Sequence, residues 1–436
     1  MDRVVQPIKK ITGGLRPPGD KSISHRYALL GAIAEGETSI RNYAPGADCA
    51  STLRCLKQLG TKISTRRVES ETDEPAEEVV IGGFGSFGRF GSQETLDAGN
   101  SGSTIRMLSG LLAGQPLRSV ITGDESLQRR PMKRIMEPLT RMGATIRARE
   151  GNFPPLEING AKLRGIEYSV PVASAQVKSC ILLAGLLAEG KTTVIEPLQT
   201  RDHTEIALEH FGAEIERGRR KTTVSGGKSL QGQRLTVPGD LSSAAFFLCA
   251  ALLFPDSDLY LRDVGLNPTR TALLDFLTGM GADIKLLNLG ETAGELIGDI
   301  HVTGNRLSGG EIDGEMVAGL IDEIPVLAVL GTQTQEGLVV RGAQELRVKE
   351  SDRIATVAEN LQGMGAKVEV FEDGFAVPGK QPLMGAEIES YGDHRIVMAF
   401  AVAALTAKGE TRIRNSDAAT VSFPGFFEEL ERVAER

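Results

Sequence analysis

The sequence repeats one pattern six times, and this repetition limits the possible folds more than any other feature. Each copy opens with a short polar segment, continues as a helix that is apolar on every side, and ends in a turn or strand. The copies span 19–40, 99–114, 174–194, 239–261, 322–340 and 392–413. A helix that is apolar all round must be buried on every side. Six of them cannot all cover the outside of a sheet, so we expect helices inside and sheets outside.

Amphipathic helices that end in a glycine turn and a strand alternate with the apolar helices. The turn glycines recur at intervals of roughly 70–80 residues, which is too long for a solenoid unit of the usual ~20–50 residues. These glycines are Gly60, Gly143, Gly212, Gly281 and Gly365. We therefore predict an α/β protein with a two-lobed inside-out α/β barrel architecture, built from six repeated βαβαββ-like units, three per domain.

Two Pro-Gly-Asp segments, near 13–20 and 237–241, stand at equivalent points of the repeat. We interpret them as crossings between the lobes that form a hinge, although ordinary turns would have the same composition. A strand is expected over 4–11, before the first repeat. The predicted first domain spans 20–239, and the second combines 1–19 with 240–436. A cleft between two lobes is a typical ligand site.

Composition narrows the functional class. The 436 residues carry a net charge of −8, which argues against a broad nucleic-acid surface. The four cysteines, Cys49, Cys55, Cys180 and Cys249, lack metal-like spacing and are expected to be buried free thiols. The first residues lack the apolar core of a signal peptide, and the longest apolar run, from Ala244, is too short to span a bilayer. We expect a cytoplasmic protein.

The first polar opening gathers Lys21, Ser22, Ser24 and Arg26 where a buried helix begins. A purely structural interpretation is that Asp20 or Ser22 caps the helix and the cations face water. The alternative is an anion site, because a helix N-terminus offers free N–H groups and the positive end of a dipole. This stretch alone does not decide between them.

The second and third openings carry different polar groups. Gly99 and Gly102 would let a ligand approach the backbone closely, while Asn100 can act as a cap. This segment lacks the lysine that a P-loop requires. A basic run follows, of which one or two members could face a cleft: Arg129, Arg130, Lys133, Arg134 and Arg141. The third opening presents Ser174, Ala175 and Gln176, which suit a polyhydroxylated ligand, and is followed by Arg201.

The fifth and sixth openings add acids. Asp322 precedes an apolar helix, where an acid is normal for the dipole but could also serve as a base. Lys349 and Arg353 are four residues apart, which predicts one helical face, with Glu350 between them; a salt-bridged helix start would look the same. Arg395 stands directly before a buried helix and needs an anionic partner, either a ligand or a structural carboxylate.

Five of the six openings thus carry cations or polar groups at helix starts. Helix N-termini that converge with Lys and Arg describe a site for a small ligand with several negative charges, such as a phosphate plus carboxylates. The sequence has no metal-like cluster and no nucleotide fingerprint, so we expect neither a metal nor a nucleotide cofactor.

The motifs GDKSISHR, GNSGSTIR, SAQVKS, TRDHTE, DEIP, LRVKESDR and GDHR occur in one order over nearly the whole chain. In this the sequence resembles the 5-enolpyruvylshikimate-3-phosphate (EPSP) synthase family, in its divergent, class II-like bacterial branch. The resemblance implies the enolpyruvyl transferase fold. It also implies transfer of the enolpyruvyl group of phosphoenolpyruvate to the 5-hydroxyl of shikimate 3-phosphate, with release of phosphate, in the shikimate pathway to aromatic amino acids. It implies no cofactor, and we expect a monomer.

The resemblance assigns two sets of binding residues. Shikimate 3-phosphate would be held by Lys21, Ser22, Arg26, Ser174, Ala175, Gln176, Arg201, Asp322 and Lys349. Phosphoenolpyruvate would be held by Lys21, Asn100, Gly102, Arg130, Gln176, Arg353 and Arg395. In the implied reaction the hydroxyl attacks C2 while the methylene is protonated, and the tetrahedral ketal that results eliminates phosphate. Glu350 is the expected proton donor, Asp322 the expected base, and Lys21 would steady the phosphate; we also expect lobe closure on ligand binding.

Two departures from the family pattern bear on the site. Val421 occupies a place where some members have a lysine, so one cation at the phosphoenolpyruvate end is missing. This branch often has alanine where Gly102 stands, and that alanine excludes the inhibitor glyphosate. Gly102 favours sensitivity and the branch favours resistance, so the sequence leaves inhibition open.

Two other functions are alternatives to an EPSP synthase. The sister enzyme, UDP-N-acetylglucosamine enolpyruvyl transferase, shares the fold but usually has a reactive cysteine on a mobile loop; the comparable stretch here, GDESLQRRPMKR, has none. A non-enzymatic repeat scaffold predicts polar openings without a shared ligand logic, which fits poorly with an acid, a base and several cations at helix starts.

Overall fold

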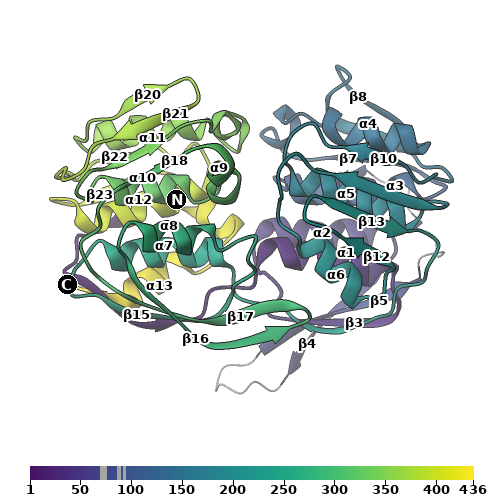
Figure 1. Cartoon of the computed structure of the whole chain (residues 1–436), viewed down its shortest axis with the longest axis horizontal. Coiled ribbons are helices and arrows are strands. Elements are labelled where there is room, and N and C mark those ends of the chain that lie inside the picture. Colours follow the sequence, from purple (N-terminus) through teal and green to yellow (C-terminus); the bar gives the residue numbers. More distant parts are fainter. Residues whose placement is uncertain (69–75, 86–89, 92–94) are drawn as a thin grey trace. The chain divides into compact units, whose positions relative to one another are not determined.

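The computed structural model describes residues 1–436 except 69–75, 86–89 and 92–94. The chain divides into two compact units (Figure 1). The N-unit comprises Gly19–Pro238 together with Glu291–Glu295. The C-unit comprises Met1–Pro18, Gly239–Gly290 and Leu296–Arg436.

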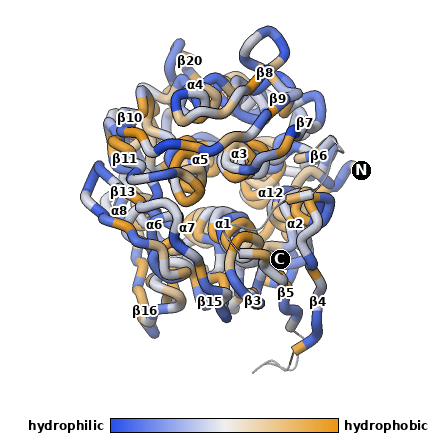
Figure 2. The backbone as a smooth tube through the Cα atoms, turned by 90° about the vertical axis from the view of Figure 1, so that its right-hand side faces the viewer, coloured by the Kyte–Doolittle hydropathy of each residue, from blue (hydrophilic) through white to orange (hydrophobic). Residues whose placement is uncertain are grey.

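Three apolar helices form the centre of the N-unit: α1 (Lys21–Ile33), α3 (Gly102–Ala113) and α5 (Ala175–Leu186). Their hydrophobic residues belong to one continuous core, and Figure 2 shows these segments surrounded by more polar strands. In α5 every residue from Val177 to Leu186 is buried, because each side of the helix meets another helix or a sheet. This is the inside-out arrangement that the repeats predict.

Three four-stranded sheets surround these helices, in the orders β14-β3-β5-β4, β6-β7-β9-β8 and β10-β11-β13-β12. The strands are β3 (Glu35–Arg41), β4 (Lys62–Val68), β5 (Ala76–Phe84), β6 (Thr95–Asp97), β7 (Arg118–Thr122), β8 (Thr145–Arg149), β9 (Phe153–Asn159), β10 (Glu167–Ser169), β11 (Lys191–Ile195), β12 (Ile215–Arg217), β13 (Lys221–Ser225) and β14 (Arg234–Thr236). The other helices are α2 (Ala47–Gln58), α4 (Lys133–Met142), α6 (His203–His210) and the 3₁₀ helix η1 (Leu127–Arg129).

The C-unit repeats the design around α7 (Leu241–Leu252), α10 (Ile324–Gly331) and α12 (His394–Thr406), which are buried along their whole length apart from Thr406. Its sheets have the orders β16-β17-β15-β2-β24, β18-β19-β21-β20 and β1-β23-β22. Their strands are β1 (Arg3–Val5), β2 (Lys10–Leu15), β15 (Asp258–Gly265), β16 (Asp283–Thr292), β17 (Glu295–Thr303), β18 (Gly310–Ile312), β19 (Leu338–Val340), β20 (Glu369–Phe371), β21 (Gly374–Val377), β22 (Glu387–Ile388), β23 (Thr411–Ile413) and β24 (Ala434–Glu435). The remaining helices are α8 (Ala272–Gly279), α9 (Gly314–Leu320), α11 (Arg353–Gly363), α13 (Phe426–Val433), η2 (Gln344–Val348) and η3 (Ser416–Val421).

Each apolar helix connects or accompanies a pair of parallel strands, but two helices take a partner strand from a distant part of the chain. Between β6 and β7, α3 makes an ordinary β-α-β crossover, and α5 does the same between β10 and β11. The strand β3 that follows α1 instead pairs in parallel with β14, from the far end of the N-unit. The strand β15 that follows α7 pairs in parallel with β2, from the start of the chain. Exchanging these strands completes one sheet in each unit.

The structure corrects one element of the sequence analysis at the amino terminus. The strand predicted over 4–11 is two strands, β1 (Arg3–Val5) and β2 (Lys10–Leu15), which belong to different sheets. Pro7 lies between them and has no backbone N–H to donate, which explains why pairing does not continue through it.

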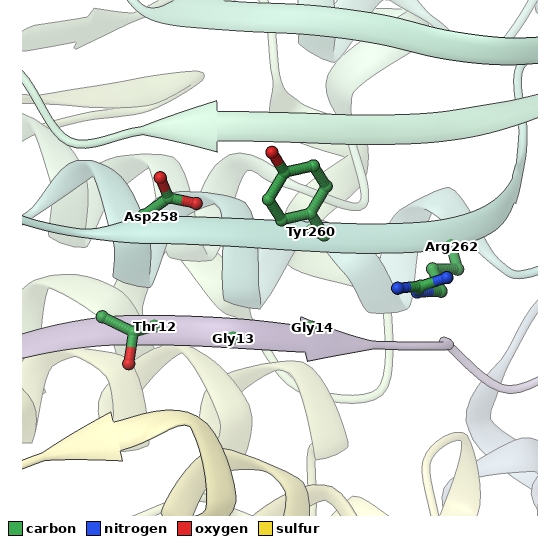
Figure 3. Close-up of a pocket in the computed structure, with 6 residues that line it drawn as sticks. All are labelled: Thr12, Gly13, Gly14, Asp258, Tyr260 and Arg262. Carbon is green, nitrogen blue, oxygen red and sulfur yellow. The ribbon is translucent and has the colours of Figure 1, made fainter.

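A hollow of about 300 Å³ lies on the exposed face of β2 and β15 (Figure 3). Its lining consists of Thr12, Gly13, Gly14, Asp258, Tyr260 and Arg262. None of the predicted site residues lines this hollow, so it is not the candidate site.

Candidate active site

The first helix start of the N-unit places a lysine beside a carboxylate. Asp20 caps α1 by accepting the backbone N–H of Ile23 at 2.8 Å, so the cap predicted at Asp20 or Ser22 is made by Asp20. Lys21, the first residue of α1, donates from Nζ to Asp48 Oδ2 at 3.0 Å. Asp48 lies in the first turn of α2 and is largely buried. The ammonium group is therefore held at the helix start, and the lysine side chain is still about one-fifth exposed.

Arg26 is buried one turn further along α1 and is fixed by three neutral acceptors. Its Nε donates to Thr204 Oγ1 at 2.6 Å, its Nη2 to Ser179 Oγ at 2.8 Å and its Nη1 to the carbonyl of Ser22 at 2.8 Å. Burial lowers the pKa of Arg26 to about 10, with the charge of Glu205 acting in the opposite direction and that of Arg201 in the same direction. Arg26 therefore stays charged near neutrality and lies within electrostatic reach of Arg201.

Two arginines, Arg106 and Arg130, lie close to Gly102 at the start of α3. Asn100 donates from Nδ2 to Asp124 at 2.7 Å, and its Oδ1 accepts Nη2 of Arg130 at 2.6 Å. Arg130 is the one buried member of the basic run predicted downstream, in the part of the chain that the structure describes. A Cβ on Gly102 would lie 2.8 Å from Nη1 of Arg106 and 3.4 Å from Nη1 of Arg130. The missing side chain at Gly102 thus leaves room for two guanidinium groups.

The start of α5 contacts the start of α3 through an amide. Ser174 caps α5 and Ala175 is its first residue, as the sequence predicts. Gln176 accepts Nη1 of Arg106 at 2.6 Å and donates from Nε2 to Ser103 Oγ at 3.0 Å. Arg106 lies in α3, one turn after the start of that helix, and was not assigned to the site from the sequence. Its partner Gln176 is seventy residues away, and no local signal identifies that pair.

In the C-unit, Asp322 is surrounded by three cations. It lies between α9 and α10, and its carboxylate is 3.9 Å from Lys349 Nζ, 3.8 Å from Arg353 Nη1 and 3.8 Å from Arg395 Nη2. Its carbonyl also accepts Nη1 of Arg395 at 2.9 Å. Four of the predicted site residues are thereby brought together by three different chain segments.

Arg353 joins three carboxylates. Its side chain is 1% exposed, and its Nε and Nη2 donate to the two oxygens of Asp393 at 2.8 and 3.2 Å. Nη2 also donates to Glu350 Oε2 at 2.6 Å. Burial opposes the charge of Arg353, but Asp393, Glu350 and Asp322 outweigh it and raise its pKa. Burial likewise favours neutral Asp393, yet Arg353 holds the pKa of that carboxyl below its usual value.

One helix prediction is wrong here. Lys349 and Arg353 were expected on one helical face, but α11 begins only at Arg353 and Lys349 has an extended backbone after η2. Asp352 caps α11 by accepting the N–H of Ala355 at 3.1 Å. Because Lys349 lies outside the helix, it reaches Asp322 through the extended segment and not through helical spacing.

The fourth opening has no cation of its own, but its Ser242 contacts a carboxylate beside Arg395. Ser242, in the first turn of α7, donates to the buried carboxylate of Glu323, which lies 3.7 Å from Nη1 of Arg395. Arg270 donates to Ser242 Oγ at 2.6 Å. These residues fix Glu323 directly beside Asp322. Sequence analysis missed this because Arg270 and Ser242 come from a turn and a helix start that share no motif.

The described part of the chain has no group of three His, Cys, Asp or Glu side chains arranged to hold a metal ion. The four cysteines are free and buried, and burial raises the pKa of the thiols of Cys55, Cys180 and Cys249. A raised pKa is the opposite of what a reactive thiolate needs. Among the same residues, no helix has the length and apolar content required to cross a membrane.

Comparison with solved structures identifies the class. The chain superposes on the enolpyruvyl transferase NikO from Streptomyces tendae with a TM-score of 0.78, covering 99% of this chain and 96% of that one, at 20% identity. It superposes on EPSP synthase from Acinetobacter baumannii with a TM-score of 0.86 at 42% identity, covering 99% and 98% of the two chains. The fold is therefore that of an enolpyruvyl transferase.

Sequence comparison narrows the class to one family. The model of the EPSP synthase (3-phosphoshikimate 1-carboxyvinyltransferase) family matches residues 5–430. The 3-phosphoshikimate 1-carboxyvinyltransferases of Solibacter usitatus and Brevibacillus brevis are 57% and 48% identical, the first over 100% of both chains and the second over 99%. The chain belongs to the EPSP synthase family. It transfers the enolpyruvyl group of phosphoenolpyruvate to shikimate 3-phosphate, in the shikimate pathway of aromatic amino acid synthesis.

Proposed function

We propose that the residues at the helix starts divide this reaction between binding and proton transfer. In the N-unit, arginines held by hydroxyls and amides bind the anionic and hydroxyl groups of both substrates. The proposed N-unit residues are Lys21, Ser22, Arg26, Asn100, Gly102, Arg130, Ser174, Ala175, Gln176 and Arg201. In the C-unit, Lys349, Arg353 and Arg395 add charge, while Asp322 and Glu350 move protons.

The observation that carries this proposal is the crowding of carboxylates around Arg353. One guanidinium serves Asp393 and Glu350 by hydrogen bonds and lies 3.8 Å from Asp322. Asp393 is fully buried in its pair with Arg353, whereas the side chains of Glu350 and Asp322 are 20% and 17% exposed. Glu350 and Asp322 are therefore the carboxyls of this cluster that a substrate can reach. A proton donor and a proton acceptor close to one another are what this addition requires.

The chemistry assigns different tasks to these two carboxyls. In the first step Asp322 accepts the proton of the 5-hydroxyl of shikimate 3-phosphate, and the hydroxyl oxygen forms a bond to C2 of phosphoenolpyruvate. In the same step Glu350 gives its proton to C3. The product of that step is a tetrahedral ketal. In the second step the bond from C2 to the phosphate oxygen breaks with its electron pair going to the phosphate, and Glu350 takes a proton back from C3. The proton that Asp322 accepted in the first step passes to the departing phosphate. Lys21 and the arginines stabilise the charge of the departing phosphate.

The test is phosphate release from phosphoenolpyruvate by the purified protein. We expect release with shikimate 3-phosphate and none with UDP-N-acetylglucosamine, because the described residues include no cysteine on a cationic loop. Asp322→Asn and Glu350→Gln should each abolish most of that release. Release with the nucleotide sugar alone would overturn the substrate assignment. Full release by both variants would overturn the proton-transfer roles while leaving the family membership intact.

We also propose that the protein works as a monomer in the cytoplasm. The sequence leads us to expect a monomer, and the four buried free thiols suit a reducing compartment. Light scattering on the eluting peak of a size-exclusion column measures the mass directly. A mass near 46.6 kDa supports the monomer, and twice that mass contradicts it.

A further inference from the structure

A buried lysine in the N-unit connects three chain segments directly behind the proposed shikimate 3-phosphate residues. Lys178 lies on α5, two residues after Gln176, and its side chain is 1% exposed. Its Nζ is 2.9 Å from Glu196 Oε2, 2.7 Å from Glu205 Oε1 and 3.5 Å from the carbonyl of Thr200. An ammonium group has three N–H donors, and these three acceptors match that number.

The three acceptors come from the segments on both sides of Arg201. Glu196 follows β11, Thr200 directly precedes Arg201, and Glu205 lies in the first turns of α6. Glu196 also accepts the hydroxyl of Thr200, so this residue is held by both its side chain and its carbonyl. Arg201 is therefore flanked on both sides by residues that Lys178 contacts directly.

The same lysine stands next to the contacts of Arg26. Ser179 and Thr204, which accept Nη2 and Nε of Arg26, are the sequence neighbours of Lys178 and Glu205. Ser179 and Thr204 also bond each other through their hydroxyls at 2.6 Å. A shift of α6 relative to α5 would displace both partners of Arg26 as well as Arg201.

We propose that Lys178 is a positioning residue for binding of shikimate 3-phosphate, which it serves by fixing Arg201 and the partners of Arg26. This inference rests on the proposed binding roles of those two arginines. Lys178 itself contacts no substrate, because its three donors are already used inside the protein. A purely structural lysine would affect stability alone, whereas a positioning lysine affects one substrate selectively.

The test compares kinetic constants for both substrates in two variants of different severity. Lys178→Met removes the cation and leaves two buried carboxylates facing each other, and Thr200→Val removes only the hydroxyl bonded to Glu196. We expect the KM for shikimate 3-phosphate to rise about tenfold or more in Lys178→Met and about threefold in Thr200→Val, by the usual scale of such losses. The KM for phosphoenolpyruvate and kcat should change less than about twofold. Thr200→Val keeps the test informative if Lys178→Met does not fold.

Matched controls come from the same unit. Lys191→Met breaks an exposed pair with Glu216 on the same sheet, and should leave both KM values unchanged. Arg201→Ala tests the binding role on which the inference rests. If Arg201→Ala leaves the KM for shikimate 3-phosphate unchanged, the proposed site is wrong.

A double-mutant cycle separates the inference from the site assignment. If Lys178 acts through Arg201, Lys178→Met should add much less to the KM for shikimate 3-phosphate in the Arg201→Ala background than in the wild type. Lys178→Arg should retain more of the wild-type affinity than Lys178→Met, because it retains the cation. Full additivity in both the Arg201→Ala and the Arg26→Ala backgrounds would overturn the inference, because these are the two arginines through which Lys178 acts. So would a Lys178→Met variant that loses stability with both KM values intact.

Discussion

The arginines around the proposed site differ between the two units in the hydrogen bonds that they donate. In the N-unit, Arg26, Arg106 and Arg130 donate to a hydroxyl, a glutamine oxygen and an asparagine oxygen. In the C-unit, Arg353 and Arg395 face carboxylates. A guanidinium bound by neutral groups keeps its full charge available to an anionic ligand. A guanidinium among several carboxylates instead adjusts where a proton is held. On the proposed mechanism, this difference separates a binding surface from a proton-transfer site.

The largest expected effect tests the chemical side of this contrast. Glu350→Gln and Asp322→Asn should lower kcat by about 10²–10⁴-fold, the usual contribution of a positioned acid or base. Affinity for shikimate 3-phosphate should change less than about tenfold, because most of its proposed contacts lie in the N-unit. Stopped-flow phosphate release gives kcat, and calorimetric titration gives the affinity. A variant that loses affinity and keeps kcat would place that carboxyl on the binding side.

The second prediction compares the free energy of unfolding after one change in each unit. Asp393→Asn leaves the buried Arg353 with a weaker partner and should cost about 3 kcal/mol or more. Thr204→Val removes a hydroxyl bonded to Arg26 and should cost about 1–3 kcal/mol. Guanidinium chloride unfolding measures both values. Equal costs would show that neutral and charged partners contribute alike.

The third prediction concerns the space at Gly102. Gly102→Ala places a methyl group 2.8 Å from the end of Arg106, so that flexible side chain has to move. We expect the KM for phosphoenolpyruvate to rise about 3–10-fold, which corresponds to roughly 1 kcal/mol. Gly279→Ala is the matched control, since no neighbouring atom lies within 4 Å of its added Cβ. An unchanged KM in Gly102→Ala would remove this glycine from the site.

The smallest expected effect is a pH dependence specific to the N-unit. His25 is buried, and desolvation lowers its pKa from 6.5 to about 3 despite the opposing charge of Asp48. Below pH 6.5 His25 binds a proton in the unfolded chain but stays neutral in the folded chain. The free energy of unfolding therefore falls as the pH decreases from 6.5 towards 3. From pH 7.5 to 5.5 the wild type should lose about 1 kcal/mol more than His25→Asn. Asparagine keeps a group that can bond Thr52, as His25 Nδ1 does at 2.7 Å.

Much of the fold could be predicted from the sequence, because burial on all sides leaves a strong local signal. The six apolar helices and their polar starts were found where the structure has them. The pairing of β14 with β3 and of β2 with β15 was not, since strands that join distant segments carry no local pattern. The division of residues 4–11 into two strands was missed for the same reason.

The site was predicted less completely than the fold. Motif residues such as Arg353 and Arg395 were identified, but their partners Asp393 and Glu323 became evident only from distances between segments. Arg106 and Lys178 were not assigned to the candidate site from the sequence. Whether a polar residue on a helix meets a second helix seventy positions away depends on packing, and spacing along one helix does not reveal it. The sequence does not show whether 66–80 forms an ordered strand pair, and residues 69–75 of this segment lie outside those that the structure describes.

The most direct test of the central claim follows a proton at C3. If Glu350 gives a proton to the methylene and takes one back, turnover in D2O introduces deuterium into the methylene of the enolpyruvyl product, which NMR detects. We predict that the rate of deuterium incorporation falls about 10²-fold or more in Glu350→Gln, and stays near wild type in the N-unit variant Arg26→Lys at saturating substrates. Unchanged incorporation in Glu350→Gln would contradict the division between a binding unit and a proton-transfer unit.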